Sequence, residues 1–251
     1  GKLKSIGRVD KKDSFLDTDP IERERGITIF SKQAILDFGD LCVTLLDTPG
    51  HADFLAETER TLSVLDAAIL VISGPQMVES HTRTLWQLLR TMNIPTFIFV
   101  NKMDLEGADK DKVLASLKKE LSYECVDFTE VFDMPDELSE EIATCDEELL
   151  ESFLNCGTIL FDDIRKLFKD SRIFPVLFGS ALKYTGVNEL RDVIKRTVTP
   201  YEGYDEFGAR IYKISRDDKE ERLTHMKITG GCLNVRDTIL NEKVTAIKIY
   251  D

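Results

Sequence analysis

The sequence predicts an α/β domain with a mostly parallel sheet, followed by the start of an all-β barrel domain. Short β-branched runs alternate with helical patterns up to about residue 200, which is typical of a parallel sheet with helices on both faces. After Thr199-Pro200 the pattern changes to short strands separated by turn signals such as Gly230-Gly231. We therefore expect two domains, residues 1–200 and residues 201–251, the second with too few strands for a closed barrel.

Five runs rich in β-branched and aromatic residues predict strands in the first domain. The first two are expected to form a hairpin, because Gly39-Asp40 between them is a turn signal. The continuous apolar runs that follow are typical of strands buried on both faces, although Pro175 favours a position near the end of its strand. The expected strands are Ile27–Phe38, Leu41–Leu46, Ala67–Ile72, Pro95–Val100 and Ile173–Phe178.

Helical patterns lie between these runs. Residues 79–92, 109–121 and 187–198 are expected to be helices, because apolar side chains recur on one face. Further helical pieces are expected after residue 121, through an acidic stretch and as far as Phe168. In the second domain four short runs predict strands: Phe207–Ile214, Leu223–Thr229, Thr238–Leu240 and Val244–Tyr250.

The composition is that of an ordinary globular protein. Hydrophobic residues make up 42% and charged residues 31% of the 251 positions, which excludes global disorder and collagen. No apolar run approaches the roughly 20 residues of a membrane span, and the N-terminal residues show no apolar signal segment. The five cysteines are scattered without a C-x-x-C pair, as in reduced proteins without a zinc site. We therefore expect a cytoplasmic protein.

The net charge of −13 is concentrated in one stretch. Residues 120–151 hold 13 of the 46 acidic residues and no lysine or arginine, whereas charges balance in the rest of the chain. We interpret this stretch as a solvated insertion in the first domain; the alternative is a segment that binds a partner. Phosphate would repel it, so it should stay away from nucleic acid.

Two motifs point to a phosphate and a divalent cation. Asp47-Thr48-Pro49-Gly50-His51 follows the apolar run LCVTLL, and an aspartate at the carboxyl end of such a strand points into the ligand crevice of an α/β sheet. There Asp47 can hold Mg²⁺ through water, and Gly50 lets a backbone N–H approach a terminal phosphate. Upstream, Thr28 in Arg25-Gly26-Ile27-Thr28 offers a hydroxyl that ligates Mg²⁺ when a γ-phosphate is present. A loop ordered by the triphosphate and released after hydrolysis would act as a switch.

Two further motifs suit guanine. Asn101-Lys102-Met103-Asp104 follows the run PTFIFV, and Asp104 can accept hydrogen bonds from both N1–H and the exocyclic amine of the base. Adenine lacks this donor pair and would leave the carboxylate unpaired. The stem of Lys102 can cover one face of the base, and Asn101 would tie neighbouring loops together. Gly179-Ser180-Ala181 follows the run IFPVLF, where small residues let a backbone N–H reach the guanine O6.

In this order the four motifs resemble those of the guanine-nucleotide-binding domain of GTPases, a fold of the P-loop NTPase type. Residues 22–29 (ERERGITI) and 47–51 (DTPGH) are similar to translational GTPases, in which a β-domain also follows. Residues 51–73 look most like the tetracycline-resistance ribosomal protection proteins, relatives of elongation factor G. Elongation factor G carries a larger insertion than the 74 residues between Asp104 and Gly179, which also favours that branch.

The resemblance implies a ribosome-dependent GTPase that forms GDP and phosphate, with Mg²⁺ as cofactor. Ribosomal RNA and ribosomal proteins would be its partners, with no role for DNA or a membrane. His51 matches the catalytic histidine that positions the attacking water in a phosphoryl transfer driven by positioning and charge stabilisation. The implied nucleotide-binding residues are Thr28, Asp47, Gly50, Asn101, Lys102, Asp104, Ser180, Ala181 and Leu182, of which Thr28 and Asp47 would hold the metal.

The sequence contains no G-x-x-x-x-G-K-[ST], the loop that cradles the β- and γ-phosphates in this fold. We expect the first strand of the family and its phosphate loop to lie upstream of this chain. Their loss would leave a gap in the sheet between the strands that end at Asp47 and Gly74. We therefore expect the 251-residue chain by itself to bind GTP poorly and to be inactive.

Two alternatives stay open. Within the same superfamily, the parent protein would be elongation factor G or the GTPase that recycles release factors. In another class, the chain would be a pseudo-GTPase that binds partners without turnover, as an absent phosphate loop predicts. The retention of Thr28, Asp47, His51 and Asp104 argues against that interpretation.

Overall fold

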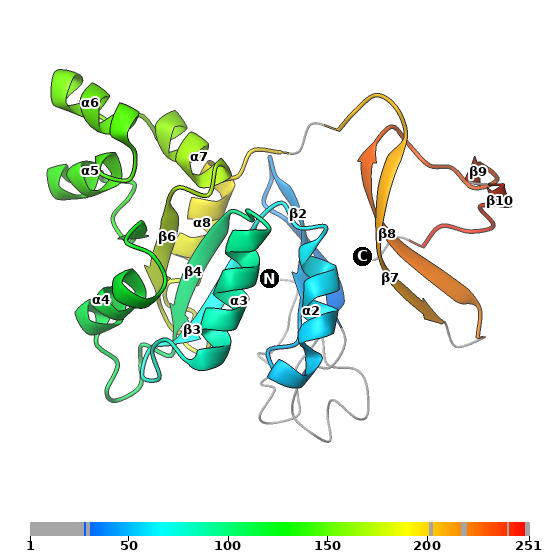
Figure 1. Cartoon of the computed structure of the whole chain (residues 1–251), viewed down its shortest axis with the longest axis horizontal. Helices are drawn as coiled ribbons and strands as arrows, with labels where there is room; N and C mark the ends of the chain where they lie inside the picture. The colour runs from blue at the N-terminus through cyan, green and yellow to red at the C-terminus, as the bar shows by residue number, and fades with distance from the viewer. Residues whose placement is uncertain (1–27, 29–30, 201–202, 217–219, 240, 249–251) are drawn as a thin grey trace. The chain divides into compact units, whose positions relative to one another are not determined.

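The computed structural model describes residues 28, 31–200, 203–216, 220–239 and 241–248 (Figure 1). The chain divides into two compact units, residues 65–199 and residues 1–64 together with 200–251. Each unit is described by itself. No helix in the described ranges combines the length and apolar character that crossing a bilayer would require.

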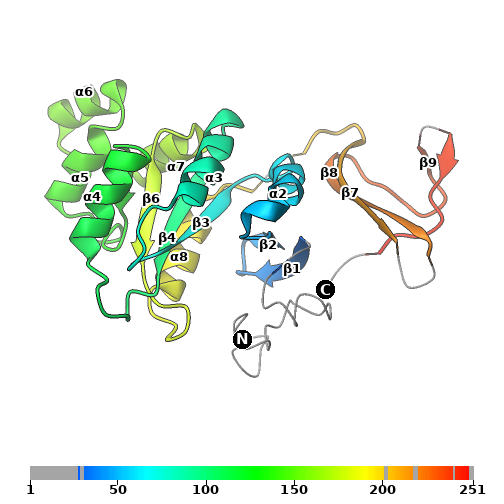
Figure 2. The same ribbon diagram turned by 60° about the horizontal axis from the view of Figure 1, so that its bottom comes forward.

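Unit 65–199 is built on a parallel four-stranded sheet in the order β3-β4-β6-β5. Strand β4 lies inside this sheet and all of its residues except the last are buried. Two apolar cores cover the two faces, one with α3 and α4 and the other with α5, α7 and α8 (Figures 1 and 2). The strands are β3 (Ala68–Ser73), β4 (Thr96–Asn101), β5 (Cys125–Asp127) and β6 (Phe174–Phe178). The α/β fold class expected from the sequence is confirmed.

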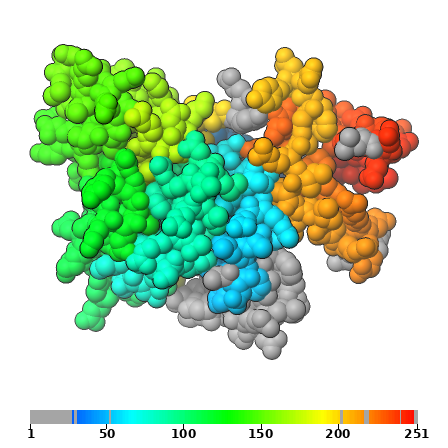
Figure 3. Space-filling view, in the orientation of Figure 1, coloured from blue at the N-terminus to red at the C-terminus, as the bar shows by residue number. Residues whose placement is uncertain are grey.

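Six helices connect and cover the described strands of this unit. Asp109 and Asp146 cap two of them, since their side chains accept hydrogen bonds from Lys112 N (3.1 Å) and Leu149 N (2.8 Å). The helices are α3 (Ser80–Thr91), α4 (Lys110–Glu120), α5 (Asp136–Ala143), α6 (Glu147–Cys156), α7 (Phe161–Lys169) and α8 (Val187–Thr197). Residues of the acidic stretch, drawn in green, lie on the face seen in Figure 3. The same stretch also supplies core side chains, among them Val126, Phe128 and Ile142, so its interpretation as a solvated insertion stays a prediction.

In its described residues the other unit contains three antiparallel strand pairs, β1-β2, β7-β8 and β9-β10, and one α-helix. Strands β1 (Lys32–Asp37) and β2 (Cys42–Asp47) pair in register around Gly39, whose φ of +89° suits the expected turn. A short 3₁₀ turn, η2 (Ala52–Phe54), leads into α2 (Leu55–Leu62). The all-β segment consists of β7 (Gly208–Arg216), β8 (Arg222–Gly230), β9 (Thr238–Ile239) and β10 (Glu242–Lys243). Strands β7 and β8 form a long antiparallel hairpin.

The exposure of the side chains of strand β3 differs from what the sequence predicted. The run Ala67–Ile72 was expected to be buried on both faces, but Ile69 is 38% and Val71 59% exposed, whereas Leu70 and Ile72 are buried. Side chains alternate between the two faces of a strand, so one face of β3 is open. Among the described residues β3 pairs only with β4, and β2 pairs only with β1. The expected gap between the strands that end at Asp47 and Gly74 stays a prediction.

Three other elements differ from the expectations. The strand expected at Val244–Tyr250 is wrong for its described residues 244–248, which have no regular secondary structure, and β10 lies before them at Glu242–Lys243. Strand β5 was not predicted, because a run of three residues gives no periodic signal. Helix α2 was not predicted either, although its buried side chains Thr58, Thr61 and Leu62 recur at helical spacing.

Candidate functional site

The expected guanine residues follow two neighbouring strands of one parallel sheet. Asn101 ends β4, and Ser180 comes two residues after β6. Because Ile98, Phe99 and Val100 pair in parallel with residues 176–178, the two strands end at the same edge of the sheet. The structure therefore brings the N-K-M-D and G-S-A motifs side by side.

The side chain of Asn101 joins the two loops. Its Oδ1 accepts hydrogen bonds from Lys102 N at 2.8 Å and from Ala181 N at 2.9 Å, across a separation of 80 residues. The backbones add two more bonds, from Met103 N to Gly179 O (3.0 Å) and from Gly179 N to Val100 O (2.9 Å). Asn101 thus has the tying role that the sequence predicts for it.

The backbone of the N-K-M-D loop is strained at one residue. Lys102 has a φ of +62°, in the left-handed region that residues with a Cβ rarely adopt. Such a conformation costs about 1 kcal/mol or more and persists where the surroundings impose it. Here hydrogen bonds flank the strained residue, from Lys102 N to Asn101 Oδ1 and from Met103 N to Gly179 O, and Asp104 follows beyond the end of β4.

The carboxylate of Asp104 is held ionised. Its side chain is 16% exposed, and Oδ2 lies 3.4 Å from Lys183 Nζ. A hydrogen bond from the Ser180 hydroxyl, and then the charge of Lys183, hold the pKa of Asp104 below its ordinary value. An ionised carboxylate offers only acceptors, which is what the N1–H and amine of guanine require. Lys183 was not among the predicted residues, since nothing in its spacing marks it.

The loop after β6 is packed too tightly for larger residues. Ser180 is buried, and its N–H donates to both the carbonyl oxygen (3.0 Å) and the hydroxyl (3.1 Å) of Thr185. A Cβ on Gly179 would overlap the Thr185 carbonyl, and Gly186 has a φ of +76°. Leu182 is 44% exposed at the tip of this loop.

The N–H groups of the loop after β6 differ in their partners. That of Ala181 donates to Asn101 Oδ1. In the described part of the chain no backbone hydrogen bond engages the N–H of Leu182. Of these two N–H groups, that of Leu182 is therefore the one left for a ligand.

The D-T-P-G-H segment belongs to the other compact unit. Asp47 is the last residue of β2 and is half-buried. The carbonyl of Pro49 accepts a hydrogen bond from the Thr58 hydroxyl on α2 at 3.2 Å, which anchors the segment to that helix. Gly50 is exposed, and a Cβ there would meet nothing within 4 Å, so a ligand has room to approach.

His51 follows with a largely open side chain, 54% exposed. Its Nδ1 accepts a hydrogen bond from Asp53 N at 3.4 Å and lies 3.4 Å from Asp53 Oδ2. These contacts engage one ring nitrogen and leave Nε2 as the atom for a substrate or water. Thr28 is half-buried, and Arg25, Gly26 and Ile27 of its motif lie outside the described residues.

A divalent cation fits these residues only together with a nucleotide. Among the described residues no three histidine, cysteine or acidic side chains gather as a metal site. Mg²⁺ keeps several waters and needs only one or two protein oxygens beside the phosphates. The carboxylate of Asp47 and the hydroxyl of Thr28 are hard oxygen donors of the required kind.

Comparisons with known proteins found relatives of similar sequence and a solved structure of similar fold. Residues 1–200 match the family model of the elongation factor Tu GTP-binding domain. The tetracycline resistance protein TetO of Streptococcus mutans is 35% identical over 267 residues, covering 100% of this chain and 42% of that protein. TetP of Clostridium perfringens is 34% identical, covering 95% and 40%, and TetM of Staphylococcus aureus is 33% identical, covering 100% and 42%.

The chain spans about two fifths of the length of these relatives. A crystal structure of a Thermus thermophilus protein superposes with a TM-score of 0.81 at 20% identity, over 95% of this chain and 43% of the other, and so shares the fold. The resemblance to tetracycline resistance proteins inferred from the motifs is confirmed. Because the family model covers most of the sequence, the chain belongs to the family of elongation factor Tu GTP-binding domains.

Proposed function

We propose that the protein of which this chain is part is a ribosome-dependent GTPase of the ribosomal protection type. The observation that carries the proposal is the joined pair of loops at the ends of β4 and β6, with an ionised Asp104 between them. The relatives of similar sequence are named tetracycline resistance proteins. Domains at residues 1–200 and 201–251 and a cytoplasmic location belong to the same proposal.

In the proposed complex the guanine base is recognised by side chains of unit 65–199. Asp104 accepts from N1–H and the exocyclic amine, and the stem of Lys102 covers one face of the ring. The N–H of Leu182 donates to O6, supported by Ser180 and Ala181. Asn101 touches no base atom and keeps the two loops together.

The proposed hydrolysis uses the other unit. Mg²⁺, when bound, neutralises charge on the β- and γ-phosphates, and Asp47 and Thr28 would hold it. The N–H of Gly50 donates to the terminal phosphate. His51 orients the attacking water through Nε2 while Asp53 holds the opposite side of the ring.

The test is a titration with fluorescent GDP and GTP, with and without Mg²⁺. It uses the protein at its full natural length and the 251-residue chain beside it. Asp104→Asn removes the acceptor pair, and two charge-assisted hydrogen bonds correspond to a loss of affinity of about 100-fold or more. Affinity for xanthine nucleotides should rise, because xanthine carries a carbonyl where guanine has its amine.

A matched control is Asp111→Asn, which changes an acidic residue in the first turn of α4 and should leave the affinity unchanged. Stimulation of GTP hydrolysis by ribosomes then tests the catalytic part of the proposal. If the full-length protein binds neither GDP nor GTP, the pseudo-GTPase interpretation replaces this one.

A further inference from the structure

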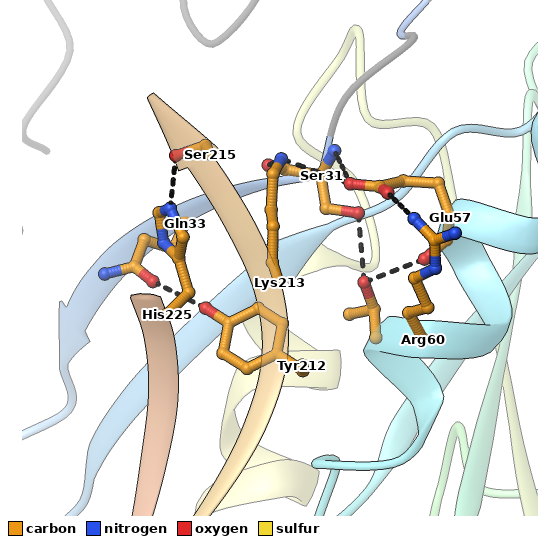
Figure 4. Close-up of polar contacts among 9 residues, drawn as sticks. Ser31, Gln33, Glu57, Arg60, Tyr212, Lys213, Ser215 and His225 are labelled. Carbon is orange, nitrogen blue, oxygen red and sulfur yellow. Dashed lines mark hydrogen bonds and ion pairs between the residues drawn. The ribbon is translucent and has the colours of Figure 1, made fainter. Parts of the chain in front are cut away.

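One lysine of the β7–β8 hairpin reaches the segments that carry the proposed catalytic residues. Lys213 Nζ lies 3.1 Å from the carbonyl oxygen of Ser31 and 3.1 Å from Glu57 Oε1 on α2 (Figure 4). The side chains of Lys213 and Glu57 are only 18% and 17% exposed. A single ammonium group thus joins β7, the chain just before β1, and helix α2.

The two segments that Lys213 joins also contact each other. Ser31 N donates to Glu57 Oε1 at 3.4 Å, and the Ser31 hydroxyl lies 3.0 Å from the hydroxyl of Thr61 (Figure 4). Burial by itself would raise the pKa of Glu57, but the hydrogen bond and charge of Lys213 and the Ser31 N–H outweigh it and lower the pKa. The ionised carboxylate of Glu57 therefore accepts from both Lys213 Nζ and Ser31 N.

The hairpin holds the other end of α2 as well. Arg210 Nη1 donates to the carbonyl of Ser63 at 2.6 Å, and Lys227 Nζ donates to the carbonyl of Val64 at 3.0 Å. Cations at the C-terminal end of a helix satisfy its free carbonyls and complement its dipole. Three cations of the hairpin therefore fix α2 from its first turn to beyond its last.

The anchored segments lead directly to the proposed catalytic residues. Ser31 comes three residues after Thr28, and Glu57 comes six residues after His51. Between His51 and Glu57 lies only the short turn η2 and the start of α2, and Thr58 binds the carbonyl of Pro49 at 3.2 Å. A shift of α2 would therefore be passed on to Gly50 and His51.

We propose that Lys213 is a positioning residue for GTP hydrolysis, which holds His51 in place through Glu57 and helix α2. The guanine-binding loops after β4 and β6 contain none of these residues, so Lys213 should act on the chemical step and not on base recognition. The inference rests on the proposed function, because it assigns a role in the same reaction.

The experiment compares variants of the full-length protein in single-turnover GTP hydrolysis with ribosomes and in GDP binding. Lys213→Met keeps the aliphatic stem and removes the charge, and hydrolysis should fall by about tenfold or more, since small displacements of positioned groups have large effects on rate. GDP affinity should stay within about twofold. The exchanged pair Lys213→Glu with Glu57→Lys should restore part of the rate, because opposite charges meet again.

Arg216→Met is the matched control, because it removes a cation from the same strand whose contacts are exposed and local to the hairpin. Amide hydrogen exchange over residues 55–62 gives a second readout, and Lys213→Met should accelerate it while Arg216→Met does not.

Lower hydrolysis together with lost GDP affinity would show a general folding defect and overturn the proposal. Normal hydrolysis in Lys213→Met would also overturn it. If the unmodified protein binds GDP but ribosomes do not stimulate hydrolysis, the proposed function fails first, and the positioning role fails with it.

Discussion

The residues proposed to recognise the base and those proposed for hydrolysis lie in different compact units and are built in different ways; we call these two groups of residues the two halves. The guanine-binding loops extend from buried parallel strands and are tied by Asn101 with two hydrogen bonds. The segment from Gly50 to His51 is exposed, and its neighbouring helix α2 is held by the β7–β8 hairpin. Under the proposed function, recognition of the base would therefore depend on the sheet, whereas the geometry for hydrolysis would depend on contacts from the β7–β8 hairpin.

The largest expected difference between the two halves is in the loss of stability when a glycine is replaced by alanine. Gly186→Ala should lower the free energy of unfolding by about 3 kcal/mol, because Gly186 has a φ of +76° and a Cβ would overlap the Phe178 carbonyl. Gly50→Ala should change it by less than about 0.5 kcal/mol, since a Cβ there meets nothing within 4 Å. Chemical denaturation of both variants measures the contrast, and equal losses would show that the halves are equally packed.

Asn101→Ala is expected to have the next largest effect. It removes the acceptor of two backbone N–H groups, those of Lys102 and Ala181, which corresponds to about 2 kcal/mol of stability. The loops would separate, so GDP affinity should fall as well, although Asn101 touches no base atom in the proposed complex. Denaturation and nucleotide titration test both effects. Asn155→Ala is the control, because Asn155 Nδ2 donates only to the exposed helix carbonyl of Glu151 (2.9 Å), and a similar loss there would contradict the tying role.

The order of these loops along the chain and the tie by Asn101 could be predicted from sequence, but the contacts of the hairpin could not. Each strand has its own apolar run, and each motif follows its strand directly, so local patterns suffice to place Asn101 and Ser180 at one edge of a sheet. The contact of Lys213 with Ser31 spans 182 residues and depends on how the hairpin packs. The exposed face of β3 was missed for a related reason, because an apolar run does not show what covers it.

Acid should weaken the hairpin before it affects the guanine-binding loops. Burial, and then the charge of Lys213, lower the pKa of His225 below its ordinary 6.5, although Glu57 opposes this. Its ring lies 2.8 Å from the Ser215 hydroxyl and next to Tyr212, which donates to Gln33 at 3.2 Å (Figure 4). The pKa of His225 is lower in the folded than in the unfolded protein. The contribution of His225 to the free energy of unfolding is therefore complete above about pH 6.5 and is lost as the pH falls through the folded pKa.

The loss should be below about 1 kcal/mol, because the ring is only half-buried. Thermal unfolding between about pH 7.5 and 5.5, on either side of the ordinary histidine pKa, measures it, with His225→Gln as the comparison. The variant should show a smaller decrease than the unmodified protein. An identical decrease in both proteins would assign the acid sensitivity to groups other than His225.

The smallest effect on stability is expected at the residue with the largest proposed effect on catalysis. His51→Ala should change the free energy of unfolding by less than about 0.5 kcal/mol, because the side chain is 54% exposed and contacts mainly its neighbour Asp53. Ribosome-stimulated hydrolysis should fall by about 100-fold or more, because the attacking water would no longer be held in position. GDP affinity should be unchanged, since the guanine-binding loops lie after other strands. If the variant instead lost GDP binding together with hydrolysis, recognition and hydrolysis would share one set of contacts, and the division between the two halves would be wrong.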